Sequence, residues 1–380
     1  MQRTRRDFIK TGAVASAMIG AVAESGLDAA QSGHTIPLPT ERAKALMALF
    51  GLKYPIFEAP HGRQTCADLA IAVSNAGAMG ALAFLGNPDE TRTVVSRVRS
   101  ATKGPFFVNF LLALAPMSGS EPTSLKAALD AGAPIVQFSW GTPTKEAIAM
   151  ILAAGAKWGI QVTSSEGARA ALDLGADYLV CQGTEAGGHV QATRGLYEAL
   201  PIVLEEAREK PVVASGGIGN GKGIREALLA GASAAMLGTR FVATVESIAH
   251  PAYKQAIIAA YAKDTALTVC FQDGWAATHR ALRNRTFRMW DAAGCPPPGK
   301  RPGEGDVLAT RPDGTKIRRY RMESPLRDSE GEVTECALYA GRSVEYVKDL
   351  PAAGELVQRL WRECETAPKD VPPIRGDKKS

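Results

Sequence analysis

The residues best suited to chemistry lie in the stretch 177–189, which reads DYLVCQGTEAGGH. An apolar run ends in Gln182 and is followed by the carboxylate Glu185, two glycines and His189. A buried strand that opens into a site at its carboxyl end has this pattern, because the glycines let a bound group approach the backbone. Histidine can also move a proton near neutral pH. The alternative is a Gly-Gly turn followed by a surface histidine.

Two later segments end apolar runs with glycine, namely PVVASGGIGNGKG at 211–223 and AAMLGTRF at 234–241. Phosphate in barrel folds is commonly held by the loops after the seventh and eighth strands, where backbone N–H groups meet the anion. The alternative is a pair of tight turns that bind nothing. The residues expected to offer donors to an anion are Gly216, Gly217, Gly238 and Thr239.

Other cofactor motifs are absent from the sequence. Residues 216–222 fit GxxxxGK, but Gly223 stands where a P-loop needs Ser or Thr to hold magnesium. The spacing also fails the GxGxxG pattern of a dinucleotide-binding turn. The six cysteines contain no CxxC pair, so we expect no metal site.

Eight short apolar runs alternate with helical patterns, and this alternation predicts a parallel sheet. We therefore expect an α/β fold of the (β/α)8 TIM barrel type, with a doubly wound open sheet as the rival. Thr163 and Glu166 predict a capping box at the start of one helix. Arg240 and Glu246 are expected to pair at the barrel rim. The predicted strands are 54–59, 79–84, 105–111, 134–138, 160–163, 177–182, 211–215 and 234–237.

The regular alternation stops after Thr244. We assign residues 45–249 to the barrel and 250–365 to a helical and irregular extension that packs on it. Within the extension, residues 284–332 are rich in Pro, Gly and Arg and predict irregular structure. The segment 351–365 predicts a closing amphipathic helix, and 366–380 a disordered tail.

The first 30 residues have the features of an export signal. Arg5 and Arg6 precede Phe8 and Lys10, and a short apolar run follows. This order resembles the twin-arginine signal, which predicts passage through the twin-arginine export machinery to the periplasm, often with the cofactor already loaded. The run is too short for a stable membrane anchor. A disordered basic tail is the alternative.

The net charge does not suggest a nucleic-acid partner. The formal value of +5 is spread over 44 basic and 39 acidic residues, so no strongly basic face is indicated. The expected partners are instead a small-molecule substrate and O2. A chain of 380 residues with 46% hydrophobic content can bury one or two good cores.

EAGGH after a strand, SGGIGNGKG and LGTRF together resemble the nitronate monooxygenase family, formerly called 2-nitropropane dioxygenases. The segments YPIFEAP, LAIAVSNAGAMG, PFFVNFL and LYAGRSV support the resemblance, which covers residues 52–360. It implies an FMN-dependent barrel enzyme that oxidises alkyl nitronates or nitroalkanes with O2 to a carbonyl compound and nitrite. The same superfamily includes FMN-dependent enoyl reductases.

The resemblance also implies roles for single residues. His189 matches the proton-handling histidine of the family, which would either take the α-proton of a neutral nitro compound or steady the nitronate anion through a hydrogen bond. A base with a pKa near the working pH suits the first role. Asn109 and Gln182 would contact the flavin, and the glycine-rich loops would hold its phosphate. The implied cofactor-binding residues are Asn109, Gln182, Gly187, Gly188, Gly216, Gly217, Met236, Leu237, Gly238 and Thr239.

The chain departs from the family pattern at the expected mouth of the substrate site. His61 stands where many relatives carry Met, and Val190 and Gln191 replace a basic residue and a glycine. His61 is either a polar group aimed at substrate or a surface histidine. Trp140 either walls the substrate pocket or plugs the barrel. These departures leave FMN binding intact and put the nitronate substrate in question.

Two further functions stay open at this point. One is an NAD(P)H-dependent flavin reductase that acts on enoyl-type substrates. The other is a non-catalytic exported protein that binds flavin or a phosphorylated ligand.

Overall fold

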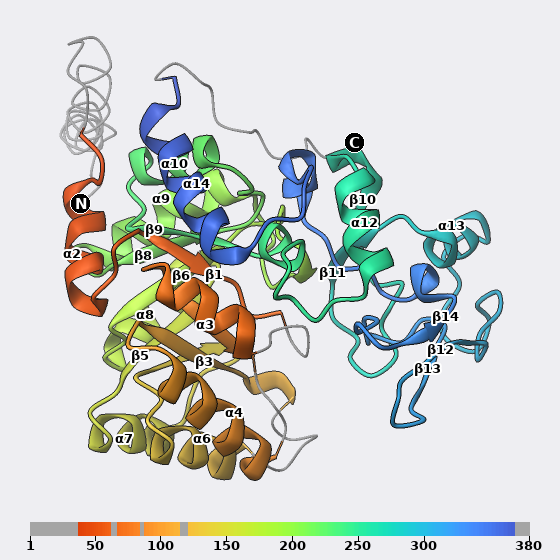
Figure 1. The fold of residues 1–380 in the computed structure, drawn as a ribbon, viewed down its shortest axis with the longest axis horizontal. Coiled ribbons are helices and arrows are strands. Elements are labelled where there is room, and N and C mark those ends of the chain that lie inside the picture. Colours follow the sequence, from red (N-terminus) through yellow and green to blue (C-terminus); the bar gives the residue numbers. More distant parts are fainter. Residues whose placement is uncertain (1–36, 62–66, 84–86, 115–120, 369–380) are drawn as a thin grey trace, which may run out of the picture. The chain divides into compact units, whose positions relative to one another are not determined.

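Eight parallel strands form the central sheet of the computed structural model, which describes residues 37–61, 67–83, 87–114 and 121–368 (Figure 1). The sheet order is β1-β9-β8-β6-β5-β4-β3-β2. The two outer strands also meet, because the Met79 N–H donates to the Ile56 carbonyl at 2.9 Å. The sheet thus closes into the predicted (β/α)8 barrel. Its strands are β1 (Ile56–Glu58), β2 (Gly80–Ala83), β3 (Phe106–Leu111), β4 (Ile135–Ser139), β5 (Lys157–Val162), β6 (Tyr178–Gln182), β8 (Val212–Ser215) and β9 (Ala234–Leu237).

The seam between β1 and β2 is completed by a buried carboxylate. Glu58 has no exposed surface, and its Oε2 accepts a hydrogen bond from the Ala81 N–H at 3.0 Å. The side chain therefore supplies an acceptor where the two short strands do not pair. Burial raises the pKa of Glu58 above its ordinary value.

Helices follow the strands around the barrel. Ser164, in an extended conformation, caps α8 by accepting a hydrogen bond from the Gly167 N–H at 3.1 Å. The predicted cap at Thr163 is therefore wrong by one residue. The helices are α2 (Glu41–Phe50), α3 (Ala67–Asn75), α4 (Pro88–Ala101), α6 (Glu121–Asp130), α7 (Lys145–Ala153), α8 (Ser165–Asp173), α9 (Leu196–Ala207), α10 (Gly221–Leu229) and the short α11 (Thr239–Val242).

One strand begins earlier than its pattern suggests. The sequence predicts a strand at 160–163, but β5 begins at Lys157. Gly159 interrupts the apolar pattern, yet it is required inside the strand because a Cβ atom there would overlap the Tyr178 ring. A glycine in a strand often marks such a close approach.

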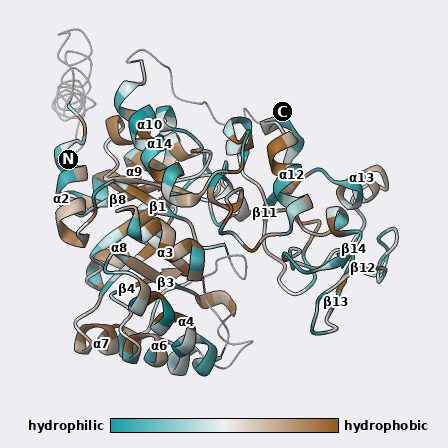
Figure 2. Cartoon of the chain, viewed as in Figure 1, coloured by the Kyte–Doolittle hydropathy of each residue, from teal (hydrophilic) through white to brown (hydrophobic). Residues whose placement is uncertain are grey.

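The lower part of the barrel is filled by apolar side chains. Phe57, Phe107, Ile135 and Tyr178 are buried in one cluster with residues from the other strands. In Figure 2 the barrel strands are mostly brown, which marks hydrophobic residues. Strands buried on both faces have this composition, and the cluster forms a rigid floor beneath the carboxyl ends of the strands.

The C-terminal part is more regular than its composition suggests. The region 284–332, predicted to be irregular, contains a helix and a three-stranded antiparallel sheet in the order β13-β12-β14. The strands are only two to four residues long, which is too short for an alternating apolar pattern to stand out among the turn residues. The elements are α12 (Pro251–Ala259), η3 (Ala262–Asp264), β10 (Thr265–Thr268), β11 (His279–Leu282), α13 (Arg285–Ala292), β12 (Val307–Thr310), β13 (Lys316–Arg318), β14 (Glu330–Gly331), η4 (Val333–Glu335), η5 (Arg342–Tyr346) and α14 (Ala353–Thr366).

The predicted closing helix is α14, which packs on α10 and α3 (Figure 1). Leu356, Val357 and Leu360 are buried on its inner face. The predicted Arg240–Glu246 ion pair is wrong. Arg240 is buried and pairs with Asp349 at 3.0 Å, whereas Glu246 accepts a hydrogen bond from the backbone at the start of α14.

The described residues from Pro39 onward belong to one compact unit, and those before it to another. The predicted signal at 1–30 lies outside the described residues, as does the tail beyond residue 368. In the described part of the chain, no helix combines the length and the apolar character needed to cross a membrane.

Candidate functional site

The inner wall of the barrel changes from apolar to polar toward the carboxyl ends of its strands. Because side chains alternate along a strand, Asn109 points the same way as Phe107, and Gln137 the same way as Ile135. The apolar partners belong to the buried floor. Polar groups therefore line the mouth, namely Asn109, Gln137, Ser139, Gln161, Gln182 and Ser215.

A chain of hydrogen bonds orients Asn109. The Tyr178 hydroxyl donates to Gln137 Oε1 at 3.1 Å, and Gln137 Nε2 donates to Asn109 Oδ1 at 3.1 Å. Asn109 Nδ2 donates to Ser139 Oγ at 3.2 Å. The amide is thus fixed with its carbonyl occupied, and its second N–H has no acceptor among the described residues. An amide donor held in this way can bind a ligand above the floor.

Gln182 fastens the turn that carries His189. Its Oε1 accepts from the Gln191 N–H at 2.8 Å and from Gln161 Nε2 at 3.3 Å. Its Nε2 donates to the His189 carbonyl at 3.3 Å. Gln191 also accepts from Gln161 at 3.1 Å, while Val190 is buried beside two alanines. At these two positions a buried valine thus stands in place of the expected basic residue, and an amide bonded to Gln161 and Gln182 stands in place of the expected glycine.

His189 lies on the short strand β7 (Gly188–His189), which pairs with β11 of the extension. Its ring centroid lies 4.3 Å from Trp275, 5.3 Å from Tyr339 and 5.5 Å from His279. The Nε2 atom is buried and has no hydrogen-bond partner in the described part of the chain. Burial, with a smaller contribution from His279, lowers the pKa of His189 to about 3, so the imidazole is neutral at physiological pH.

His279 stands opposite His189 in the strand register but is fully bonded. Its Nδ1–H donates to the Ala277 carbonyl at 2.9 Å, and its Nε2 accepts from the Phe271 N–H at 3.1 Å. These two bonds fix one neutral tautomer. Burial lowers the pKa of His279 to about 4. This histidine supports the site and has no free nitrogen to act on a substrate.

The glycine-rich loops fit a bound anion. The N–H groups of Gly217, Gly238 and Thr239 donate no hydrogen bond to any described residue. Gly217 has φ +74°, a left-handed conformation that glycine adopts without strain. Met236 packs in the barrel floor and Leu237 pairs with β1, so Gly238 and Thr239 are the free donors of that segment.

The two glycines before His189 differ in their surroundings. A Cβ added at Gly187 would overlap the backbone nitrogen of Gly341, so this glycine permits contact with the extension. Gly188 has φ +74° and open space where a Cβ would lie. Gly216, at φ +120°, packs against the loop at Gly183. Of these three positions, Gly188 leaves room for a bound group to approach the backbone.

His61 connects the end of β1 to the loop after β9. Its Nε2–H donates to the Gly238 carbonyl at 2.9 Å, and its Nδ1 lies 3.8 Å from Glu58 Oε1. The side chain is therefore turned toward the barrel rim rather than toward bulk water. Residues 62–66, which continue this loop, lie outside the described part of the chain.

Trp140 follows β4 at the mouth. Its indole packs edge-on against Trp275, with ring centroids 4.7 Å apart and an interplanar angle of 72°. Both rings are half-buried. The pair stands beside the His189 imidazole, so Trp140 reaches the site through Trp275.

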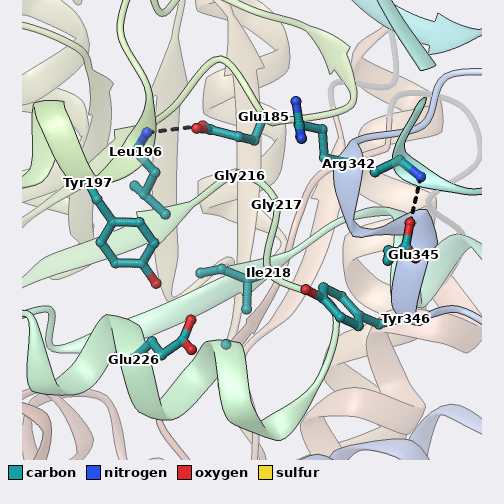
Figure 3. A pocket seen from close by; sticks show the side chains of 12 residues that line it. Glu185, Leu196, Tyr197, Gly216, Gly217, Ile218, Glu226, Arg342, Glu345 and Tyr346 are labelled. Atoms are coloured by element: carbon teal, nitrogen blue, oxygen red, sulfur yellow. Dashed lines mark hydrogen bonds between the residues drawn. The ribbon is translucent and has the colours of Figure 1, made fainter. Parts of the chain in front are cut away.

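A cavity of about 250 Å³ lies on one side of the Gly216–Gly217 turn (Figure 3). Glu185, Glu226 and Glu345 line it together with Tyr197 and Tyr346. Burial raises the pKa of Glu185 and of Glu226, and Figure 3 shows the Glu226 carboxylate rising toward the Tyr197 hydroxyl. Arg342 also lines this cavity, so three carboxyl groups and one guanidinium offer a phosphate no excess of positive charge. The free amides of Gly238 and Thr239, which do not line this cavity, are the better anion donors.

The nitronate monooxygenase family model matches residues 43–363. A nitronate monooxygenase of Pseudomonas aeruginosa is 33% identical, with 83% of this chain and 97% of that protein covered. An indene-carboxyl-CoA dehydrogenase of Mycobacterium tuberculosis is 32% identical over 74% of this chain and 77% of that protein. A nitroalkane oxidase structure from Streptomyces ansochromogenes has a TM-score of 0.67 at 32% identity, covering 85% and 99%. The chain belongs to the nitronate monooxygenase family.

This family consists of flavin-dependent oxidoreductases, and the chain is therefore an enzyme of that class. The structure brings Asn109, Gln182, His189 and the glycine-rich loops to the same end of the barrel. The described residues contain no group of three or more metal-ligating side chains. The polar mouth, free amides and unpartnered imidazole nitrogen suit a flavin enzyme.

Sequence reasoning missed the site residues that come from the extension. Trp275 and His279 lie about 90 residues after His189, in a region with no clear period. Tyr339 lies in the LYAGRSV segment, which supported the resemblance but carried no assigned role. The pairing of β7 with β11 joins residues about 90 positions apart in the sequence. No local sequence pattern predicts such a contact.

Proposed function

We propose that this enzyme oxidises alkyl nitronates with O2, using FMN, to a carbonyl compound and nitrite. The proposal depends on one observation above the others: a neutral imidazole at the mouth of the barrel with a buried Nε2 that has no partner among the described residues. Overall, two nitronate anions and one O2 give two carbonyl compounds and two nitrite ions: each oxygen atom of O2 forms one new carbonyl, and each C–N bond breaks to release nitrite. Family membership supports the reaction class.

The residues at the mouth fit FMN. The amides of Gly217, Gly238 and Thr239 would receive the phosphate, and the oriented amide of Asn109 would contact the ring. Gly188 leaves space for the cofactor beside the His189 turn. When bound, FMN supplies the redox chemistry by accepting electrons from the nitronate and passing them to oxygen.

The low pKa of His189 favours one of the two roles that the resemblance implies. A group with a pKa of about 3 is a weak base at neutral pH and is poorly suited to take an α-proton. The same neutral ring can carry a proton on Nε2 and donate it to a nitro oxygen. The preformed nitronate is therefore the favoured substrate, and His189 orients it by a hydrogen bond.

The test is anaerobic mixing of the purified enzyme with ethyl nitronate while the flavin spectrum is followed. We expect bleaching by the nitronate and recovery of the colour when oxygen is admitted, with nitrite released. A folded sample that is colourless and takes up no FMN would contradict the cofactor. A flavin that ethyl nitronate does not reduce would contradict the reaction.

A second candidate is the NAD(P)H-dependent reduction of an enoyl-type substrate. The 32% identity to a protein named as a CoA-ester dehydrogenase favours it, because that relative acts on a different substrate class. Anaerobic mixing with NADH separates the two candidates. Rapid bleaching by NADH, with none by ethyl nitronate, would support the reductase; the reverse result supports the oxidation of nitronates.

We also propose that the enzyme is exported to the periplasm by the twin-arginine machinery. The support is the Arg5-Arg6 pair followed by Phe8, Lys10 and a short apolar run. Replacing both arginines by lysine should keep the protein inside the cell. Measured by cell fractionation, an unchanged periplasmic yield would contradict this proposal.

A further inference from the structure

The backbone at Trp140 adopts a conformation that is costly for its residue type. Its φ is +59°, in the left-handed region, where a bulky side chain other than glycine is an outlier. Gly141 follows at φ +149°, and a Cβ there would lie 2.8 Å from the Leu112 Cβ. The turn after β4 is therefore fixed by close packing. Strain of this kind is kept where the surrounding structure over-determines it, and it often marks a functional position.

Trp275 reaches the same place from the extension. Its backbone N–H donates to the Gln272 carbonyl at 3.0 Å, and Gly274, at φ +106°, gives it a tight turn. A Cβ at Gly274 would lie 3.3 Å from the Met322 side chain, so the turn is backed by packing. The two indoles come from distant parts of the chain, and a tight turn fixes the backbone at each of them. Both side chains stay half-buried.

The described rings that continue the stack from Trp275 are uncharged: His189 lies against Trp275, and His279 and Tyr339 lie against His189. His189 and His279 are neutral because burial lowers their pKa values. The Tyr339 hydroxyl donates to the Met322 carbonyl at 2.8 Å and burial raises its pKa. A charged substituent would lose its hydration beside these groups and gain no counter-charge from them, whereas an apolar one would be stabilised.

The angle between the indoles favours a ring over an alkyl chain. With the planes at 72°, a third ring can lie flat against one indole and edge-on to the other. Both arrangements are preferred between aromatic rings. The stack leads directly to His189, since Trp275 lies against the imidazole with an interplanar angle of 31°.

We propose that Trp140 and Trp275 determine specificity by forming an aromatic wall that selects nitronates with an aryl group over short alkyl nitronates. The inference rests on the proposed function, because it places the nitro group at His189 Nε2. The aryl group then lies against the two indoles, on the carbon next to the nitro-bearing carbon. Trp140 is thus a wall of the pocket and not a plug.

The test compares three nitronates on the FMN-loaded enzyme: those of 2-phenyl-1-nitroethane, 2-cyclohexyl-1-nitroethane and nitroethane. The cyclohexyl compound matches the phenyl compound in size but lacks a π system. We expect kcat/KM to be about tenfold higher for phenyl than for cyclohexyl, the size of one or two aromatic pairs. Equal values for phenyl and cyclohexyl would overturn the proposal.

Two variants locate the effect. Trp140→Gly removes one indole and suits the left-handed backbone, so the fold should be kept; Trp275→Leu removes the other. Each should lower the phenyl-to-cyclohexyl ratio by about threefold or more, and the ratio cancels any loss of activity that both substrates share. Trp361→Phe is the matched control, because Trp361 lies on α14 and packs against Tyr54. If the phenyl-to-cyclohexyl ratio of kcat/KM is unchanged in both indole variants, the proposal of an aromatic wall is wrong.

A binding experiment distinguishes failure of this inference from failure of the proposed function. Calorimetric titration of neutral 2-phenyl-1-nitroethane and its cyclohexyl analogue needs no turnover. If no nitronate is oxidised but the phenyl compound binds more tightly, and Trp140→Gly removes the difference, the wall stands and the proposed function fails. If nitronates are oxidised and the two ligands bind equally to both proteins, the wall fails and the function stands.

Discussion

His189 from the barrel and His279 from the extension face each other across one register position, yet their hydrogen bonding differs. His279 uses both ring nitrogens within the protein, whereas His189 keeps a buried Nε2 without a partner among the described residues. The same contrast holds for the other groups at the site. The barrel mouth presents a free amide donor at Asn109 and free backbone N–H groups, whereas Tyr339 of the extension is hydrogen-bonded within the protein.

The division of roles is physically reasonable. An unpartnered polar atom costs free energy when buried, so it persists where a ligand compensates for it. Its position must then be fixed by neighbours that are fully bonded themselves. The barrel floor and the extension provide those neighbours from below and from the side.

Replacing His189 by Asn should have the largest effect. Asn cannot place a donor at the position of the ring Nε2, so we expect kcat with ethyl nitronate to fall by about 100-fold to 1,000-fold, the usual cost of losing one hydrogen bond to a developing anion. FMN content and the melting temperature should stay near those of the parent enzyme, because Nε2 contributes no internal bond. Unchanged turnover would remove His189 from its assigned role and break the contrast between the two histidines.

His279 should affect stability through pH. Its folded pKa of about 4 lies below the unfolded value of about 6.5, so within that window the unfolded chain binds a proton that the folded chain does not. The free energy of unfolding should therefore fall as the pH is lowered from 6.5 to 4, by up to about 1.4 kcal/mol per unit.

Urea denaturation at several pH values measures this dependence. His279→Gln should flatten the slope by the contribution of one imidazole, while His189→Asn provides the matched comparison for the other. Parallel curves for the parent and His279→Gln would show that His279 gains its proton in the folded protein as easily as in the unfolded chain.

The sequence predicts the barrel better than it predicts the extension. The barrel strands are continuous apolar runs, and each lies within a few residues of its predicted place because burial on both faces imposes that composition. The turn 185–189 and the loops at 216–217 and 238–239 could be located because glycine and polar residues end those runs. The first error of note, at β5, came from a glycine that packs against Tyr178.

The extension could not be predicted as well. Its strands β12 to β14 are short and hold few apolar residues, so no period-two pattern is visible. Trp275 and His279 reach the site through the antiparallel pairing of β11 with β7, which depends on tertiary contacts. The predicted Arg240–Glu246 ion pair is wrong for the same reason. Arg240 pairs instead with Asp349, more than 100 residues later in the sequence, and this contact depends on the tertiary structure.

Gly187→Ala tests the contact between the two regions. The added Cβ would overlap the backbone of Gly341, and we expect a loss of about 1–3 kcal/mol in the free energy of unfolding. Affinity for FMN, measured by flavin fluorescence quenching, should change little. This outcome would assign Gly187 to packing, in contrast to the cofactor contact that the family resemblance implied.

Gly188→Ala is the matched control. It has φ +74° and no neighbour within reach of a Cβ, so backbone strain of about 1 kcal/mol is the expected cost. We assign the open space beside Gly188 to FMN, so this variant should weaken FMN binding more than Gly187→Ala does. The opposite order would reverse the roles of the two glycines.

Glu246→Gln should have the smallest effect. The Glu246 carboxylate accepts a hydrogen bond from the Ala353 N–H at 2.9 Å, at the start of α14, where a negative charge is favourable. Gln keeps an acceptor but loses the charge, so we expect a loss of about 0.3–1 kcal/mol in the free energy of unfolding, smaller at high salt. Glu355→Gln, in the exposed first turn of the same helix, is the control.

Because α14 packs on α10 and α3, on the outer layer of the barrel, kcat should not change in Glu246→Gln. A fall in kcat without loss of stability would mean that the outer helix influences the mouth, and the separation between supporting and reacting regions would have to be redrawn.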